Sequence, residues 1–404
     1  MGYMDNNLES RIEEVLSRGV AEVIDRANLK KKLLSGKKLR IKLGIDPTSP
    51  NLHLGRAVSL LKLRDLQDLG HQVILLIGDF TGVIGDTSDK ESERPMLQVE
   101  AVKENMRSYR EQAGKILDME KVEYYYNSTG LSKLGYAEIG EQADQFSLAE
   151  FIARENIRKR LDAGTRISLR ELLYPLMQGY DSVALQADLE LGGTDQRFNL
   201  LAGRTLQKKY GQEPQDILMV NLIEGTDGRK MSSSWGNTIN LLDEPNAMFG
   251  KVMSMGDGLI VEYFIHCTRV ALEDIEKMEK DMAAGVMNPR DAKLELAREI
   301  VKIYHGETEA DKAKEYFVKT ISNKEIPEEV REVNVDKEEI KLVEFLVLAG
   351  LAKSNGEARR KIEQGGLEIN EARESDWQRV LTGSDDGAVF KVGKFGFAKI
   401  KFEK

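Results

Sequence analysis

Residues 40–56 of the chain read RIKLGIDPTSPNLHLGR, and this stretch decides the fold class. Its first six residues predict a strand, and the sequence DPTSP that follows is typical of a turn. Leucines that recur between Leu54 and Leu69 predict a helix ending at Gly70. The near-continuous apolar run from Val73 to Phe80 predicts a second strand, of the kind that a parallel sheet buries on both faces. Strand, helix and strand with short links form a βαβ unit.

The same pattern returns near the middle of the chain. Residues 192–195 (GGTD) begin a predicted helix that reaches Lys209, and Ile217 to Ile223 is another apolar run. We therefore expect an α/β fold whose doubly wound parallel sheet, Rossmann-like, extends to about residue 230. Residues 1–36 are expected to be helical. Residues 95–180, between the two predicted units, are expected to be mostly helical and amphipathic.

Beyond the sheet the sequence predicts two further parts. Helical spacing continues from Pro245 to about Pro327, and the acidic stretch Asn323 to Lys337 contains a proline, which indicates a linker. In the tail we expect a helix at residues 339–348, a second helix from Ser354, and short strands ending in residues 389–402. The predicted domains are residues 1–234 with the sheet, an α-helical domain at 235–330, and a small α+β domain at 336–404.

Composition narrows the class of protein. The chain has 404 residues, of which 41% are hydrophobic and 31% charged, as in ordinary globular proteins. It has no apolar run long enough to span a membrane and no secretory signal, and its single cysteine excludes an internal disulfide and a cysteine-built metal site. These features predict a cytoplasmic protein without a membrane partner. The net charge of −9 disfavours a general nucleic-acid coat but allows a local basic surface.

Two polar segments indicate a phosphate ligand. His53-Leu54-Gly55-Arg56 begins the first predicted helix, where unpaired N–H groups and the helix dipole favour anions. Lys230-Met231-Ser232-Ser233-Ser234 forms a predicted loop with one lysine and three hydroxyls. Either segment alone is more simply a turn. Both, however, follow predicted parallel strands, one in each half of the sheet, and ligands of open α/β sheets bind at that edge. The glycine-rich motifs of the commoner nucleotide folds are not convincingly present.

The two segments resemble the signatures of class I aminoacyl-tRNA synthetases. Residues 78–86 (GDFTGVIGD), 173–181 (LYPLMQGYD) and 192–196 (GGTDQ) narrow the resemblance to the tyrosyl-tRNA synthetases. Helical spacing puts Tyr174, Gln178 and Asp181 on one face, where a carboxylate can accept a hydrogen bond from a phenol. Five segments in family order are very unlikely to coincide by chance.

The resemblance implies that residues 1–234 are a catalytic domain that activates tyrosine with ATP and transfers it to tRNA(Tyr). Magnesium would arrive with ATP, so no protein metal site is expected, and no protein nucleophile is needed. The implied tyrosine-binding residues are Lys42, Thr81, Asp86, Tyr174, Gln178, Asp181 and Gln196. The implied ATP-binding residues are Gly44, Asp46, His53, Gly55, Arg56, Gly193, Asp195, Leu222, Ile223 and Lys230. The residues implied to stabilise charge in the reaction are Thr48, His53, Lys90, Arg94, Lys230, Ser232, Ser233 and Ser234.

The tail resembles the S4 RNA-binding fold in residues 354–370 and 392–400. Arg359, Arg360 and Lys361 would then contact RNA phosphates. The family also implies a homodimer whose interface is the helical insertion of residues 95–180, with tRNA spanning both subunits.

Three positions depart from the family pattern. Arg56 stands where a second histidine is usual, Ser233 where a second lysine is usual, and Lys42 where many members have a tyrosine that shares the substrate hydroxyl. We hypothesise that a bound potassium ion or Arg56 replaces the missing lysine charge. Three other interpretations remain open at this stage: an inactive RNA-binding paralogue, the related tryptophanyl enzyme, and an activating enzyme for another aromatic acid.

Overall fold

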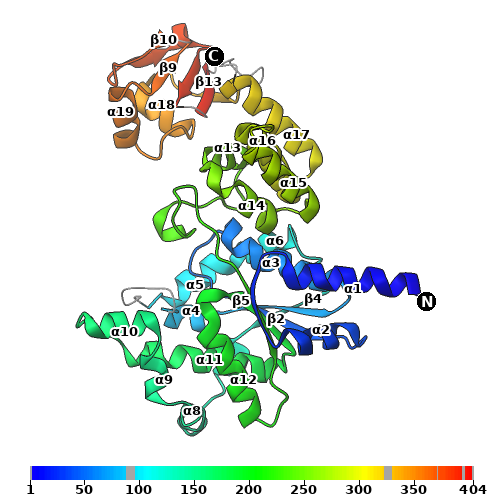
Figure 1. Ribbon diagram of the computed structural model, residues 1–404. Coiled ribbons are helices and arrows are strands. Elements are labelled where there is room, and N and C mark those ends of the chain that lie inside the picture. Colours follow the sequence, from blue (N-terminus) through cyan, green and yellow to red (C-terminus); the bar gives the residue numbers. More distant parts are fainter. Residues whose placement is uncertain (1, 88–95, 323–329, 371, 394–395, 403–404) are drawn as a thin grey trace. The chain divides into compact units, whose positions relative to one another are not determined.

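The structure, a computed structural model, describes residues 2–87, 96–322, 330–370, 372–393 and 396–402 (Figure 1). The chain divides into two compact units. Unit 1 comprises residues 1–243 and 251–306, and unit 2 comprises residues 244–250 and 307–404.

Unit 1 contains a six-stranded sheet with the order β1-β6-β5-β2-β3-β4. Its strands are β1 (Val20–Ile24), β2 (Arg40–Ile45), β3 (Gln72–Ile77), β4 (Val122–Tyr126), β5 (Leu189–Gly193) and β6 (Asp216–Val220). All neighbouring strands pair in parallel except β1, which pairs antiparallel with β6 at one edge. The doubly wound parallel sheet is therefore confirmed, with one antiparallel edge strand added.

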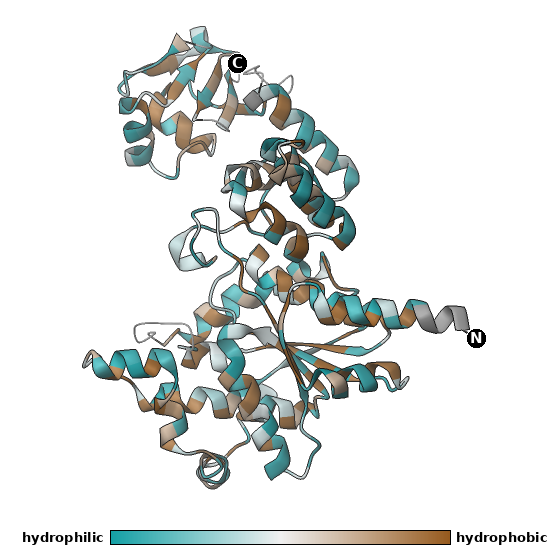
Figure 2. Cartoon of the chain, in the orientation of Figure 1, coloured by the Kyte–Doolittle hydropathy of each residue, from teal (hydrophilic) through white to brown (hydrophobic). Residues whose placement is uncertain are grey.

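The central strands are buried because helices cover both faces of the sheet. Every residue of β3 from Val73 to Ile77 is at most 3% exposed, and Figure 2 shows the central strands as largely hydrophobic. The covering and inserted helices are α1 (Gly2–Ser17), α2 (Arg26–Leu34), α3 (Leu54–Asp68), α4 (Thr81–Ile84), α5 (Val99–Asn105), α6 (Tyr109–Gly114), α7 (Ser128–Leu131), α8 (Tyr136–Ala143), α9 (Leu148–Ile152), α10 (Glu155–Asp162), α11 (Leu169–Leu185) and α12 (Arg197–Lys209). The predicted helix at residues 54–69 corresponds to α3.

The prediction of continuous helix over residues 1–36 was wrong. Gly19 has a φ of 62°, a backbone conformation that other residues rarely adopt, and it separates α1 from β1. Val20, Val23 and Ile24 fit helical spacing, but they are β-branched and lie on an edge strand. The strand β4, with three tyrosines in sequence, was also missed within the region expected to be mostly helical.

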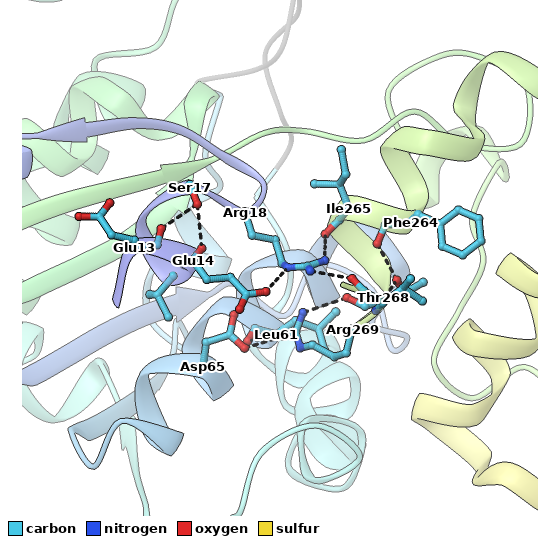
Figure 3. Close-up of polar contacts among 12 residues, drawn as sticks. Glu13, Glu14, Ser17, Arg18, Leu61, Asp65, Phe264, Ile265, Thr268 and Arg269 are labelled. Carbon is cyan, nitrogen blue, oxygen red and sulfur yellow. Dashed lines mark hydrogen bonds and ion pairs between the residues drawn. The ribbon is translucent and has the colours of Figure 1, made fainter. Parts of the chain in front are cut away.

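A polar network joins three helices of unit 1 (Figure 3). Nearly buried Arg18, beyond the end of α1, pairs with Glu14 at 3.0 Å and donates to the carbonyl of Val270 at 2.7 Å. Arg269 follows α14 (Ile260–Cys267) and pairs with Asp65 of α3 at 3.0 Å. These contacts connect the helical segment after the sheet to α1 and α3. Unit 1 also contains α15 (Leu272–Ala283) and α16 (Pro289–His305), whereas residues 245–250 of α13 (Pro245–Ser254) are counted in unit 2.

In unit 2, α17 (Glu307–Phe317) precedes a small α+β fold. Its elements are β7 (Glu332–Val335), β8 (Glu339–Lys341), α18 (Leu342–Leu348), α19 (Asn355–Glu363), β9 (Leu367–Ile369), β10 (Ala372–Arg373), β11 (Val380–Thr382), β12 (Val389–Val392) and β13 (Gly396–Phe402). They enclose a core that includes Phe345 and Phe390. The expected linker is partly wrong because β7 pairs in parallel with β13, and the helix expected from residue 339 begins only at Leu342. Residues 323–329 of that linker lie outside the described ranges.

Within the described ranges, no helix combines the length and the apolar character that crossing a membrane requires.

Candidate active site

The candidate site lies where the strand order of the sheet reverses. From β2 the chain continues to β3 on one side, while β5 pairs with the other side of β2. Ligands of open α/β sheets bind outside the carboxyl ends of the strands at such a switch point. Most of the residues selected from the sequence lie on the segments that follow β2, β3, β5 and β6, or on α11.

His53 is the N-cap residue of α3 and is only 8% exposed. Burial, and then the positive charges of Arg56 and Lys230, lower the pKa of its imidazole to about 3. The ring is therefore neutral at pH 7, and its Nδ1 has no hydrogen-bond partner in the described part of the chain. Arg56, one turn into the helix, is exposed. The start of α3 thus presents a neutral imidazole beside an exposed cation, a suitable combination for a polyphosphate.

Asp46 follows β2 and is the centre of a hydrogen-bonded cluster in the site. Its carboxylate accepts hydrogen bonds from Thr81 Oγ1 at 2.7 Å and from Tyr174 OH at 2.8 Å. Burial raises the pKa of this carboxyl to about 6, against the effect of the two hydrogen bonds. A Cβ on Gly78 would overlap both the Asp46 carboxylate and the Thr81 hydroxyl. Glycine is therefore required there for the close approach of these groups.

Asp181 on α11 is 3% exposed and belongs to the same hydrogen-bonded cluster. Its Oδ2 accepts from Asn127 Nδ2 at 3.2 Å, and the same amide donates to Thr81 Oγ1 at 2.9 Å. Burial raises the pKa of Asp181 to about 7, although the charge of Lys42 and the Asn127 hydrogen bond lower it. A nearly buried carboxylate with few donors is prepared to accept a hydroxyl from a ligand.

Gln178, one turn before Asp181 on α11, lies on the same face as the sequence predicts. Its Nε2 donates to Glu190 Oε1 of β5 at 3.1 Å. Lys42 of β2 also contacts Glu190, with 2.9 Å between Nζ and Oε1. The ammonium of Lys42 is thus engaged by protein groups beneath the site.

The segment after β5 holds a second pair of polar residues. Gln196 Nε2 donates to Asp86 Oδ2 at 2.7 Å, which brings together two of the residues implied to bind tyrosine. A Cβ on Gly193 would lie 2.8 Å from Leu222 Cδ2 and would also crowd Asp195. The backbone at Gly193 is therefore open only because the residue is glycine. Ile223, next to Leu222, is buried and lies beyond the observed strand, because β6 ends at Val220 and not at Ile223 as predicted.

The loop that carries the second signature contacts both halves of the site. Lys230 Nζ pairs with Asp195 Oδ2 at 3.0 Å. Met231 is 4% exposed, and its sulfur accepts from the backbone N–H of Gly55 at 3.3 Å. Ser233 Oγ lies 3.2 Å from Ser49 Oγ, on the loop between β2 and α3, where half-buried Thr48 also lies. Ser232 Oγ lies 2.9 Å from Ser234 Oγ.

Asn237 holds this loop in shape and was not selected from the sequence. It is 3% exposed, and its Oδ1 accepts from the backbone of Ser232 at 2.9 Å. Its Nδ2 donates to Asp227 at 2.7 Å and to the carbonyl of Lys230 at 3.2 Å. One amide side chain therefore ties together both ends of the segment that presents Lys230.

Sequence reasoning also missed Ser49, Asn127 and Glu190. A signal was present for Glu190, because a charged residue in a buried parallel strand requires a partner, and Lys42 occupies such a strand as well. Asn127 directly follows the missed strand β4, so its position at the sheet edge could not be anticipated. Lys90 and Arg94 lie outside the described residues.

The three basic residues selected in the tail have different surroundings. Arg359 stacks over the Trp377 ring at 4.3 Å and pairs with Glu363 at 2.8 Å. Lys361 pairs with Glu357 at 2.9 Å. Arg360 is exposed on α19.

Comparison with known proteins agrees with this geometry. Residues 34–322 match the family model described as tRNA synthetases class I (W and Y), and residues 322–390 match the tyrosine--tRNA ligase SYY-like C-terminal domain. The tyrosine--tRNA ligase of Carboxydothermus hydrogenoformans is 48% identical over 401 residues, which cover 97% of this chain and 98% of that protein. The tyrosine--tRNA ligase of Thermotoga maritima is 46% identical, with 96% of both chains covered.

Solved structures share the fold at low sequence identity. The tyrosyl-tRNA synthetase of Archaeoglobus fulgidus, complexed with L-tyrosine, has a TM-score of 0.61 at 23% identity and covers 76% of this chain and 99% of that one. The C-terminally truncated mitochondrial enzyme of Coccidioides posadasii has a TM-score of 0.62 at 21% identity, covering 78% of this chain and 95% of that one.

Proposed function

The chain belongs to the tyrosine--tRNA ligases of class I, and we propose that its switch-point site activates L-tyrosine with ATP and then transfers it to the 3′-terminal ribose of tRNA(Tyr). It is an aminoacyl-tRNA ligase. The observation that carries the choice of tyrosine is Asp181, a nearly buried carboxylate connected through Asn127 and Thr81 to the Asp46 cluster. No finding favours the inactive RNA-binding alternative.

In the first step the tyrosine carboxylate attacks the α-phosphorus of ATP and pyrophosphate leaves. The substrate itself is the nucleophile, so the protein contributes orientation and charge stabilisation. We assign the phosphate contacts to Thr48, His53, Lys230 and Ser232–Ser234. We extend them, by position in the family, to Lys90 and Arg94.

For tyrosine, Asp181 accepts the phenol hydroxyl, while Tyr174, Gln178, Asp86 and Gln196 surround the α-amino group and carboxylate. Phenylalanine would leave the Asp181 acceptor without its hydrogen bond. A buried polar group left unpaired gives strong rejection, a rule for which tyrosyl-tRNA synthetases are themselves the usual example.

The ribose and adenine of ATP lie, in this proposal, along the segments after β2 and β5. Asp195 accepts from the ribose, and the open backbone at Gly44, Gly55 and Gly193 allows the nucleotide to approach. Leu222 and Ile223 line the adenine. Lys230 must exchange its ion pair with Asp195 for the phosphates. Magnesium enters with ATP as part of the substrate, and its ligands are phosphate oxygens and water.

The other partners follow from the same activity. We propose a homodimer that uses the insertion of residues 95–180, which exposes Leu148, Leu161 and Leu169. Arg360, with Arg359 and Lys361 beside it, would contact the tRNA backbone through an S4-like domain. Because tRNA charging serves translation, we place the enzyme in the cytoplasm.

The test is ATP–pyrophosphate exchange by the purified chain with tyrosine, phenylalanine or tryptophan. We expect exchange with tyrosine alone, in magnesium and potassium. A parallel series replaces potassium with tetramethylammonium; unchanged exchange there would exclude the bound-cation explanation for Ser233 and leave Arg56. Absence of exchange with every aromatic acid would refute the proposed activity.

A second prediction concerns the loop that carries Lys230. Replacing Asn237 with alanine removes the hydrogen bonds that shape this loop and should lower the kcat of exchange by about tenfold, a loss of about 1.4 kcal/mol. The KM for tyrosine should change little, because Asn237 contacts none of the residues assigned to tyrosine. Exchange at saturating tyrosine and varied ATP measures both constants. An equal rise in the tyrosine KM would contradict a role confined to the loop.

A further inference from the structure

Two oppositely charged side chains face each other inside the sheet beneath the tyrosine site. Lys42 of β2 and Glu190 of β5 are each 1% exposed, and they are direct partners in the parallel register. Their charged groups are 2.9 Å apart. Parallel strands that are covered on both faces are normally apolar, so a buried ion pair between two such strands needs a specific explanation.

All the donors of Lys42 are engaged by protein groups. Besides Glu190, its ammonium donates to Ser182 Oγ at 2.7 Å and to the carbonyl of Gln178 at 3.1 Å. An ammonium has three donors, so none is left for a substrate hydroxyl. Lys42, which the resemblance implied as a tyrosine-binding residue, therefore has no donor left for the substrate hydroxyl, which is left to Asp181.

Glu190 is bonded to the same turn of helix. Its carboxylate accepts from Gln178 Nε2 and from Ser182 Oγ, each at 3.1 Å. The pair thus holds α11 at two positions, Gln178 and Ser182, on either side of Asp181 along the helix. A shift of this turn would displace the proposed acceptor of the substrate phenol.

The pair also sets the charge environment of Asp181. Burial raises the pKa of Asp181, Lys42 lowers it, and Glu190 and Asp46 raise it. Asn127 donates to Asp181 from the segment after β4, and Tyr174 and Tyr125 also face it from α11 and β4. Lys42 is the cation among these neighbours. A buried ion pair seldom stabilises a fold more than an apolar pair would, so stability alone does not explain its presence.

We propose that the Lys42–Glu190 pair is a positioning device for recognition of the tyrosine hydroxyl. It holds the Gln178–Ser182 turn in place and sets one positive and one negative charge close to Asp181, so that discrimination against phenylalanine depends on two residues that do not touch the substrate. This inference rests on the proposed activity and specifies how its substrate is selected in this chain.

The test follows the KM for tyrosine and for phenylalanine in pyrophosphate exchange between about pH 5.5 and about pH 8.5. For the wild-type chain, the tyrosine KM should rise as pH falls through about 7, where Asp181 becomes protonated, and the phenylalanine KM should not. Lys42→Gln should move this midpoint upward and raise the tyrosine KM at neutral pH by about tenfold or more. Glu190→Gln, nearly isosteric, should move the midpoint downward. Lys37→Gln, which breaks the pair between exposed Lys37 and half-buried Asp188, is the matched control and should leave the midpoint unchanged.

The midpoint is expected to move upward in Lys42→Gln and downward in Glu190→Gln, whereas simple structural damage would not move it in opposite directions. Thermal unfolding checks that each variant folds. If Lys42→Gln does not fold, the pH dependence of the tyrosine KM in Glu190→Gln and in the wild-type chain tests the proposal. The proposal would be overturned if the tyrosine KM of the wild-type chain did not change between about pH 5.5 and about pH 8.5. It would also be overturned if a folded variant kept both the wild-type midpoint and the wild-type ratio of the KM for tyrosine to the KM for phenylalanine. Equal losses of kcat with both amino acids would overturn it as well. Absence of exchange by the wild-type chain would refute the proposed activity instead.

Discussion

Replacing Lys230 with methionine is expected to lower the kcat of tyrosine-dependent pyrophosphate exchange by about 100- to 1000-fold. Lys230 is the lysine retained in the second signature, because Ser233 occupies the position of the other. Removing one well-placed group that stabilises transition-state charge typically costs about 3 to 4 kcal/mol. Methionine keeps most of the aliphatic length, so the loss reports on the charge. The tyrosine KM should remain within about threefold, since the tyrosine residues lie on other segments.

The matched control is Lys251→Met. Lys251 is a lysine of similar exposure in an ion pair with Asp243 at 2.6 Å, and it belongs to no residue set assigned to a substrate. Its variant should exchange at the wild-type rate. If Lys230→Met and Lys251→Met lose activity equally, the assignment of Lys230 to the pyrophosphate is wrong.

The parts of the fold that were predictable have strong hydrophobic periodicity. The unit β2–α3–β3 was recognised because β3 is a near-continuous apolar run, a turn sequence follows β2, and the helix has leucines on one side. The strands β1 and β4 were missed because they lie at the two edges of the sheet, where residues are only half-buried and the apolar pattern is weak. Edge strands depend on a neighbour for pairing, and the sequence does not identify that neighbour.

The candidate site likewise has a part that was predictable from local sequence and a part that was not. Tyr174, Gln178 and Asp181 could be placed on one helical face because α-helical spacing is local. The contact of Lys42 with Glu190 depends on the adjacency of β2 and β5, which lie far apart in the sequence. The role of Asn127 depends on the missed strand β4. Long-range partners are thus the part of the site that required the structure.

Replacing Asp181 with asparagine is expected to lower the activity with tyrosine strongly and to raise the stability of the ligand-free protein. Asparagine has the same shape, but its amide is neutral and a poorer acceptor for a phenol. We expect kcat/KM for tyrosine to fall by about 1000-fold or more, with a much smaller change for phenylalanine. Pyrophosphate exchange with both amino acids measures this. Asp162→Asn, an exposed carboxylate on α10, is the control and should be neutral.

Stability should change in the other direction. The pKa of Asp181 rises from 3.8 to about 7 on folding, so the folded chain binds a proton more tightly than the unfolded chain does. Stability therefore falls as pH rises from about 4 through about 7, and the full penalty, about 4 kcal/mol for this rise in pKa, applies above that range. Asp181→Asn removes the penalty, so without ligand the variant should be more stable than wild type by about 2 to 4 kcal/mol at about pH 8.

The advantage of the variant should shrink as pH falls towards about 4, because protonated Asp181 then carries no charge penalty in the wild-type chain. Denaturant unfolding at several pH values measures the difference. A variant less stable than wild type at high pH would mean that the Asp181 carboxylate is stabilised by its neighbours rather than held against its own burial. In that case Lys42 would compensate the charge fully. A variant that is more stable than wild type would instead show that the buried Asp181 carboxylate, which has no substrate hydroxyl to bind, destabilises the ligand-free protein.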